Sequence, residues 1–332
     1  MKTSLSSKQP RTGAAQPSTG RYAGKSPGGA AVVSRLPEEV LLTRLASRYE
    51  KRFERAFAGR VAIVTGGGSG IGLALARRLA RSGGRVILAD RQGDRIEEAA
   101  EAIVREGGLA RAAVVDVTDF SGVNDLVRTT SGENGRLDFL FNNAGIAVGG
   151  GVHHYSIEDW RAMVEVNLLG VVNGVHAAYR VMKEQGFGHI VNTASAAALC
   201  ASARSVGYTA TKHAVFGLSI SLRGQAAKHG IKVSVLCPAF VRTEMLLGGG
   251  KYGKELVPLS AEELNRMIEV LKPISPDVFA IRALDAVERN EAIFVESRMA
   301  RLMWWIYRLS PELGMQLDHL MVQSSPLGRT LA

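Results

Sequence analysis

Short apolar segments alternate with helical patterns along most of this chain, and the alternation constrains its fold more than any other feature. Rich in Val, Ile and Leu, the expected strands are 61–65, 85–90, 111–117, 137–143, 188–194, 232–237 and 292–296. Apolar residues on both faces are typical of a parallel sheet that helices cover on both sides. The pattern predicts an α/β fold with a doubly wound parallel sheet, in a single domain at 58–297.

Helix start signals between the expected strands support this organisation. They are the capping boxes Ser156-x-x-Asp159 and Ser260-x-x-Glu263, and the pair Ser275-Pro276. In a capping box the first side chain accepts a hydrogen bond from the helix backbone, and a proline is well tolerated in the first helical turn. We therefore expect helices to begin at these three places.

Two helical extensions are expected to flank the domain. At 36–57, apolar residues repeat at every fourth position: Leu41, Leu45, Tyr49 and Phe53. This helix would pack on the main domain or on a partner subunit. At 298–332 we expect an amphipathic extension, whose first helix, 298–309, places on one stripe Met299, Leu302, Met303 and Ile306. Arginines border the stripe, which suits a peripheral membrane contact; the alternative is a helix that covers a cleft or a neighbouring subunit.

The positive charge of the chain does not indicate a nucleic-acid-binding protein. The formal net charge is +10, but residues 1–35 carry six Lys or Arg and no acid, so more than half of the excess lies in this tail. A tail rich in Ser, Gly, Ala and Pro cannot bury enough apolar surface to fold, so we expect residues 1–35 to be disordered. The composition is also compatible with an organelle transit peptide, but the tail lacks the apolar core of a secretory signal.

Cysteine use and hydropathy favour a cytoplasmic protein. Two cysteines, Cys200 and Cys237, cannot form a disulfide framework, and we expect both to be buried neutral thiols. No cluster of Cys and His has the spacing of a zinc site, so no metal is expected. No stretch approaches the roughly eighteen uninterrupted apolar residues of a membrane-spanning helix.

A glycine-rich turn follows the first expected strand. Residues 61–65 lead into Gly66-Gly67-Gly68-Ser69-Gly70-Ile71-Gly72, and a helical pattern comes next. Glycines at 66, 70 and 72 allow a tight turn and a close approach of the backbone to a pyrophosphate. The N–H groups of the following helix can bind that anion. The sequence therefore predicts a dinucleotide site at this turn.

An acidic residue, Asp90, ends the second expected strand, eighteen residues after Gly72. A carboxylate at this place can accept hydrogen bonds from both adenosine ribose hydroxyls, and it would repel a 2′-phosphate. The guanidinium of Arg91, in contrast, could reach such a phosphate. We expect NAD as the cofactor, with NADP as the alternative.

Tyr208 and Lys212 lie four residues apart, and Ser195 precedes Tyr208 by thirteen residues. The i,i+4 spacing places both side chains on one helix face. A phenol with a pKa near 10 is a poor base at neutral pH, but a neighbouring ammonium stabilises the phenolate and lowers its pKa. Tyr208 could then exchange a proton with a substrate oxygen that Ser195 also bonds. These residues suit hydride transfer at the carbon of an alcohol or a carbonyl group.

Together the motifs occur in the order and rough spacing of the short-chain dehydrogenase/reductase family, which the chain resembles over about 60–297. The motifs are Thr65-Gly66-x-x-x-Gly70-x-Gly72, Asn142-Asn143-Ala144-Gly145, Asn167, Ser195 and Tyr208-x-x-x-Lys212. The resemblance implies a Rossmann fold and an NAD(P)-dependent enzyme that acts on CH–OH groups. It also implies a homo-oligomer, either a dimer or a tetramer.

Roles of individual residues follow from the same resemblance. The catalytic residues would be Asn167, Ser195, Tyr208 and Lys212, with Asn167 ordering a water that connects Lys212 to solvent. The cofactor-binding residues would be Thr65, Gly66, Ser69, Gly70, Ile71, Gly72, Asp90, Arg91, Asp116, Val117, Asn143, Ala144, Gly145, Tyr208, Lys212, Pro238, Val241 and Thr243. Ala239 stands where the family usually has Gly, which slightly restricts the backbone of that loop.

Residues that face the substrate are expected in 146–155, 197–206 and 240–272. They include Val148, His153, His154, Leu199, Cys200, Phe240, Met245, Leu246 and Leu247. The apolar bias of this set favours a lipophilic ketone or secondary alcohol. Two alternatives are an NADPH-dependent 3-oxoacyl reductase of lipid synthesis and a non-catalytic nucleotide-binding scaffold. Cofactor preference would distinguish the first alternative, and a lack of turnover would indicate the second.

Overall fold

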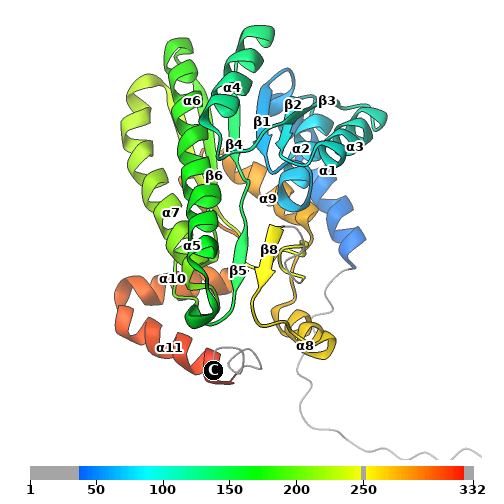
Figure 1. Ribbon diagram of the computed structural model, residues 1–332. Helices are drawn as coiled ribbons and strands as arrows, with labels where there is room; N and C mark the ends of the chain where they lie inside the picture. The colour runs from blue at the N-terminus through cyan, green and yellow to red at the C-terminus, as the bar shows by residue number, and fades with distance from the viewer. Residues whose placement is uncertain (1–36, 248–251, 325–332) are drawn as a thin grey trace, which may run out of the picture. The chain divides into compact units, whose positions relative to one another are not determined.

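Seven parallel strands form the central sheet of the chain within residues 37–247 and 252–324, which the computed structural model describes (Figure 1). Their order across the sheet is β3-β2-β1-β4-β6-β7-β9. The strands are β1 (Val61–Thr65), β2 (Arg85–Asp90), β3 (Leu109–Val114), β4 (Phe139–Asn142), β6 (Gly188–Thr193), β7 (Ile231–Cys237) and β9 (Ile293–Val295). The predicted doubly wound sheet is confirmed. Its strand order reverses between β1 and β4, the place where parallel α/β sheets bind ligands.

Two helical layers cover the sheet. Buried side chains on one face come from α1 (Glu38–Phe57), α2 (Gly70–Arg81), α3 (Gly93–Arg105) and α9 (Pro276–Glu288). On the other face they come from α4 (Phe120–Asn134), α6 (Gly170–Gln185) and α7 (Val206–Ala226). Strands β1, β4 and β6 contribute buried residues to both apolar clusters, because alternate side chains of a strand point to opposite faces.

The predicted helix starts are confirmed. Ser156 and Asp159 form a complete capping box at α5 (Ile157–Val164), and Ser260 and Glu263 form another at α8 (Ala261–Leu271). The Ser275 hydroxyl accepts from the backbone N–H of Val278 at the start of α9. Short 3-10 turns lie at Val152–His154, Ala196–Ala198, Ala203–Ser205 and Ala227–His229.

A small second sheet was not expected from the sequence. Strand β5 (Ala147–Gly149) pairs in parallel with β8 (Gly253–Glu255), which lies about a hundred residues later in the chain. Three-residue strands are too short to show a periodic pattern, so long-range pairing decides them. The expected strand at 111–117 also begins and ends earlier, as β3. The three residues after Val114 lie outside the strand and line a pocket.

Helix α1 confirms the predicted amino-terminal helix, and it packs on α9 and α2. Phe53 and Phe57 are fully buried in the core. The Arg52 guanidinium lies 2.5 Å from a carboxylate oxygen of Asp285 and 2.6 Å from one of Glu288 on α9. Arg78 of α2 lies over the Phe53 ring. In this chain the helix therefore braces the domain itself.

After β9 the chain forms α10 (Arg298–Leu309) and α11 (Pro311–Ser324), which confirms a helix at 298–309. The expected stripe needs a correction. Met299 and Leu302 are exposed, but Met303 and Ile306 are half-buried, because the helix turns a different edge towards the domain. The tail expected at 1–35 lies outside the described residues. Within the described part, no helix is long and apolar enough to span a bilayer.

Candidate active site

The glycine-rich turn between β1 and α2 requires glycine at three positions. Gly66 and Gly70 have φ angles of +64° and +51°, in the left-handed region that favours glycine. A Cβ at Gly72 would lie 2.1 Å from the carbonyl oxygen of Gly66 and 2.7 Å from Nδ2 of Asn143. Side chains at these positions would therefore block the turn, and their absence leaves backbone exposed to the adjacent pocket.

Helix α2 begins at this turn and points its first N–H groups into the same pocket. Ser69, Gly70 and Ile71 all line the pocket, and the Ser69 side chain makes no capping hydrogen bond. Free N–H groups and the positive end of the helix dipole favour an anion at this place. The turn thus fits the pyrophosphate of a dinucleotide.

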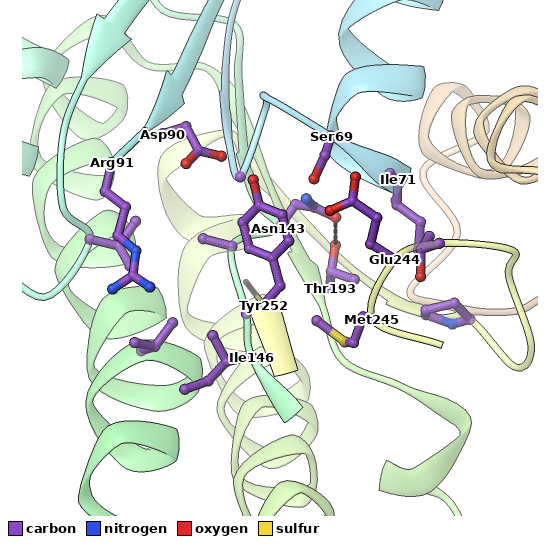
Figure 2. A pocket seen from close by; sticks show the side chains of 18 of the residues that line it. Ser69, Ile71, Asp90, Arg91, Asn143, Ile146, Thr193, Glu244, Met245 and Tyr252 are labelled. Carbon is purple, nitrogen blue, oxygen red and sulfur yellow. Dashed lines mark hydrogen bonds between the residues drawn. The ribbon is translucent and has the colours of Figure 1, made fainter. Parts of the chain in front are cut away.

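Asp90 lies at the carboxyl end of β2, where its buried carboxylate borders the pocket. It accepts hydrogen bonds from the backbone N–H groups of Gly68, at 3.4 Å, and of Gln92, at 3.2 Å. Arg91 also lines the pocket, and Figure 2 shows its side chain beside that of Asp90. This part of the pocket therefore offers a fixed hydrogen-bond acceptor, the Asp90 carboxylate, together with the positive charge of Arg91.

The turn after β4 adjoins the glycine-rich turn and forms another part of the pocket wall. Asn143, Ala144 and Gly145 line it, and so do Asp116 and Val117 from the segment after β3. The Thr65 hydroxyl accepts from the backbone N–H groups of Asn143 and Ala144, at 2.9 and 3.1 Å. Thr65 thus ties β1 to this turn and does not itself line the pocket.

Tyr208 and Lys212 lie on α7, and both line the pocket. The Lys212 ammonium lies 5.5 Å from the centre of the Tyr208 ring and donates to the backbone oxygen of Thr193, at 2.9 Å. Ser195 follows β6, is buried, and hydrogen-bonds with Tyr208. The three groups that the sequence singled out are therefore brought together: Tyr208 and Lys212 line the pocket, and Ser195 lies beside Tyr208 without being a lining residue.

Burial dominates the electrostatics of this cluster. It lowers the pKa of Lys212 to about 8, and it raises the pKa of Tyr208 against the opposing effect of the Ser195 hydrogen bond. Burial also raises the pKa of Cys237 to about 12, which agrees with the expected neutral thiol. Cys200 is half-buried, and its pKa is likewise raised by burial.

Asn167 lies in a single π-helical turn, Glu165–Leu169, between α5 and α6. Its side chain is fully buried. Oδ1 accepts from the backbone N–H of Ile146 at 2.8 Å, and Nδ2 donates to the Ile146 carbonyl at 2.9 Å and to the Thr211 hydroxyl at 3.1 Å. A Cβ at Gly145 would meet both Asn167 Oδ1 and Lys212 Nζ. Asn167 therefore positions the turn beside Lys212.

The segment after β7 also borders the pocket, and the Pro238 carbonyl accepts from the backbone N–H of Ala196, next to Ser195. Pro238 and Thr243 line the pocket, whereas Val241 is buried and bridges to Ile274. Among the described non-glycine residues, only Lys272 and Asn290 have a positive φ angle. Ala239 therefore does not need the left-handed backbone that favours glycine, and alanine fits this loop without backbone strain.

Several lining residues were not named from the sequence. Ile146, Glu244 and Tyr252 lie within the expected segments 146–155 and 240–272 but were not singled out there, whereas four residues lie outside all the segments expected to face the substrate: Val115, Val166, Thr193 and Ala194. Thr193 ends β6 and Ala194 follows it directly before Ser195, so both could have been found from that position. Within the expected segment 240–272, no motif distinguished Tyr252. Arg95 of α3 lies over its ring at 5.5 Å and pairs with Glu244. Figure 2 shows Tyr252 in the middle of the pocket view.

The expected substrate-facing residues separate into three groups. Val148 and Leu199 are buried. Cys200, Met245 and Leu246 are half-buried, and of these Met245 lines the pocket. The exposed ones are His153, His154, Phe240 and Leu247. Arg204 pairs with Glu255 at 2.7 Å and thereby links the segment after Ser195 to β8. No group of His, Cys, Asp and Glu in the described part could hold a metal ion.

Fold and site together define a nicotinamide-dependent oxidoreductase of the Rossmann type, and the family comparison agrees. The model of the short chain dehydrogenase family matches residues 60–248. The chain belongs to this family.

Similar proteins carry the same assignment. An uncharacterized oxidoreductase of Bacillus subtilis (strain 168) is 36% identical over 187 residues, which cover 56% of this chain and 73% of that protein. A crystal structure of a family member from Burkholderia phymatum in complex with NAD has a TM-score of 0.69 and 28% identity, and the match covers 77% of this chain and 95% of the other. Levodione reductase matches with a TM-score of 0.66 and 30% identity, over 73% and 97% of the two chains.

Proposed function

We propose that this protein transfers a hydride between NAD and a secondary alcohol or ketone. The observation that carries the proposal is one pocket that Tyr208, Lys212 and the glycine-rich turn all line, with Ser195 hydrogen-bonded to Tyr208. The turn suits a dinucleotide, and the cluster suits proton exchange with an oxygen atom. Both halves of the reaction are therefore served within one cavity.

In this reaction the nicotinamide supplies or accepts the hydride, and the residues of the chain handle the proton. Ser195 bonds the substrate oxygen and orients it towards the Tyr208 hydroxyl. Tyr208 accepts the alcohol proton during oxidation and returns it during reduction. The Lys212 ammonium stabilises the phenolate form, and Asn167 holds the turn that borders Lys212.

A preference for NAD over NADP is supported by Asp90. Its carboxylate is held in place by two backbone N–H groups and would repel a 2′-phosphate. The similar protein from Burkholderia phymatum was solved with NAD, whereas another similar structure, from Beutenbergia cavernae, holds NADP at low occupancy. Arg91 is the residue of this chain that would favour the second cofactor.

The proposed substrate is lipophilic, since Ile146 and Met245 add apolar surface to the lining of the pocket. We propose further that the protein acts as a homo-oligomer, a dimer or a tetramer, in the cytoplasm. A light-scattering measurement of molar mass at working concentration would test the oligomer, and a monomer would refute it.

A panel of secondary alcohols and ketones of increasing chain length, assayed with NAD and NADP in parallel, tests the reaction. We expect turnover with NAD, visible as absorbance of the reduced nicotinamide, and higher kcat/KM for the more apolar members. If NAD binds but no member is turned over, the scaffold alternative is favoured. A strong preference for NADPH and for 3-oxoacyl substrates would favour the lipid-synthesis alternative.

Replacement of Tyr208 by Phe tests the assignment of the proton-transferring group. The variant keeps the aromatic ring but loses the hydroxyl, so kcat should fall at least about a hundredfold while NAD binding is retained. Tyr179→Phe is a matched control, because Tyr179 lies on α6 and does not line the pocket. A Tyr208→Phe enzyme that keeps more than a tenth of the activity would exclude Tyr208 from this role.

A further inference from the structure

Helix α10 presents a row of large apolar side chains to solvent. The exposed fractions are 65% for Met299, 55% for Leu302, 57% for Trp305 and 81% for Leu309. These four residues recur at intervals of three and four, so they form one face of the helix. The next helix, α11, adds Leu313 and Met315, which are also exposed. Large apolar residues gathered on one surface indicate a docking site.

The opposite side of α10 is attached to the domain, so the exposed face does not belong to the core. Trp304 packs on a further buried cluster that includes Val215, Val235 and Val295, and its ring lies 6.4 Å from that of Phe216 on α7. Arg301 donates from Nε to the carbonyl oxygen of Val295, at 2.9 Å. The helix is therefore held in place with its apolar row turned outward.

Positive charge accompanies the apolar row. Arg298, Arg301 and Arg308 are exposed, and residues 298–311 contain no Asp or Glu. The Arg308 guanidinium lies over the rings of Trp304 and Trp305, at 5.2 and 5.9 Å from their centres. Tryptophan beside arginine on an amphipathic helix is the combination that binds at the headgroup level of a membrane.

We propose that the exposed face of α10 docks on the surface of an anionic lipid bilayer. Met299, Leu302, Trp305 and Leu309 enter the interface, and the arginines meet the lipid phosphates. A second copy of the chain is the less suitable occupant, because a twofold contact through this face would bring the arginines of both copies together. The helix lies on the bilayer, since α10 is too short to span it.

Docking in this way would bring the active-site edge of the sheet towards the lipid. Helix α10 begins three residues after β9 ends, at the carboxyl edge where Ser195 also follows β6. Asp318 of α11 lies near Cys200, five residues after Ser195. Figure 1 shows α10 and α11 at the same end of the domain as β5 and α5. A lipophilic substrate could then enter from the bilayer; this consequence rests on the proposed function, whereas the docking itself does not.

Flotation with lipid vesicles tests the docking. The full chain is mixed with vesicles of phosphatidylcholine alone or with added phosphatidylglycerol, and the protein that rises with the lipid is measured. We expect binding to the anionic vesicles, weaker binding to the neutral ones, and partial release by salt. The double variant Leu302→Ser/Trp305→Ser should lose at least about tenfold in binding to the anionic vesicles.

Val270→Ser is the matched control, since Val270 on α8 is exposed to a similar degree and lies on another helix. NAD binding by each variant reports whether the fold is intact and whether the cofactor site works, so failure of docking can be told apart from failure of the proposed reaction. The proposal is overturned if the parent protein does not float with anionic vesicles, or if the double variant floats as well as the parent. It is equally overturned if the double variant converts a dimer to a monomer, because a second copy would then cover this face.

Discussion

Asp90 is the single residue whose chemistry we expect to select between the two nicotinamide cofactors. Replacing it by Ala removes a fixed negative charge from the ribose end of the pocket and leaves the adjacent Arg91. We expect kcat/KM for NAD to fall and that for NADP to rise, because the repulsion of a 2′-phosphate is lost. The ratio of the two values should level or reverse.

Asp94→Ala provides the control for this change. Asp94 lies in the first turn of α3 and is exposed, and it does not line the pocket. Its removal alters the net charge by the same amount and should leave the cofactor ratio unchanged. A parent enzyme that already prefers NADP tenfold would contradict the role given to Asp90.

Lys212 should determine the pH dependence of alcohol oxidation. Burial raises the pKa of Tyr208, so the reactive phenolate forms only as the pH rises, and oxidation should accelerate towards alkaline pH. The Lys212 ammonium, 5.5 Å from the centre of the Tyr208 ring, favours the phenolate only while it is protonated, and burial lowers its pKa to about 8. In Lys212→Met the rise of kcat should therefore begin at higher pH, because the phenolate loses this support below about pH 8, whereas parent and variant should converge above it.

The measurement is kcat against pH for the parent, Lys212→Met and the control Lys228→Met, whose exposed side chain lies outside the pocket. If kcat rises at the same pH in all three enzymes, Lys212 acts only by packing or by holding the cofactor. Affinity for NAD, measured in parallel, shows whether Lys212 acts by holding the cofactor or by its effect on Tyr208.

Sequence motifs predicted most of the residues that line the pocket, because the residues of each motif are close in sequence. The turn at 66–72 and the pair Tyr208 and Lys212 are local features, and local spacing determines where their backbone or side chains point. Tyr252 and Glu244 fall in the expected segment 240–272, but no motif singled them out within it. Both contact Arg95 of α3, which lies about 150 residues earlier in the sequence. Such contacts leave no pattern in the sequence.

At the scale of single elements, α1 should contribute to stability without touching the reaction. Phe53 is fully buried against the domain core, so Phe53→Ala should lower the free energy of unfolding by about 3–5 kcal/mol. The kinetic constants should stay close to those of the parent, since no residue of α1 lines the pocket. Chemical denaturation together with steady-state kinetics measures both effects.

Val40→Ala serves as the control on the same helix, because Val40 is exposed. It should change the unfolding free energy by no more than about 0.5 kcal/mol. If Phe53→Ala and Val40→Ala behave alike, α1 is not the brace that its burial indicates. A selective loss of activity in Phe53→Ala at full stability would point to a functional role instead.

Long periodic elements were predictable and short ones were not. Helix α1 and the capped helices α5, α8 and α9 follow from i+4 spacing or from a capping residue, which are properties of a few adjacent positions. Strands β5 and β8 exist only because each pairs with the other, and the ion pair between Arg204 and Glu255 supports them. The same limit applies to the exposed stripe of α10, since its orientation is set by Trp304 packing on distant residues.

At the scale of the whole molecule, the parallel sheet was predictable because its central strands are apolar on both faces. Sheet order does not depend on single residues, and right-handed crossovers with alternating helices leave few arrangements for such strands. The interior of the sheet also contains polar groups whose partners the sequence does not reveal. His189 on β6 is buried, and its Nε2 lies 2.9 Å from the Ser234 hydroxyl on β7.

This buried histidine should make the folded molecule sensitive to mild acid. Burial, with Lys232 and Arg223 adding to it, lowers the pKa of His189 to about 3, whereas an unfolded chain would have a histidine pKa of about 6.5. Between these values the unfolded state binds the additional proton. Stability is therefore complete above about pH 6.5 and is lost as the pH falls, by up to roughly 2–3 kcal/mol at about pH 4.5.

Unfolding free energies measured at neutral pH and near pH 4.5 test this account, with His189→Gln compared to the parent. The glutamine amide can still donate to Ser234, whose hydroxyl donates to the carbonyl of Glu291 at 2.5 Å, but it binds no proton in this range. The variant should consequently lose less stability on acidification than the parent. His213→Gln removes an exposed histidine from α7 and should retain the full acid sensitivity. If the parent and His189→Gln lose the same unfolding free energy between the two pH values, other groups, such as the buried carboxylates, govern acid unfolding.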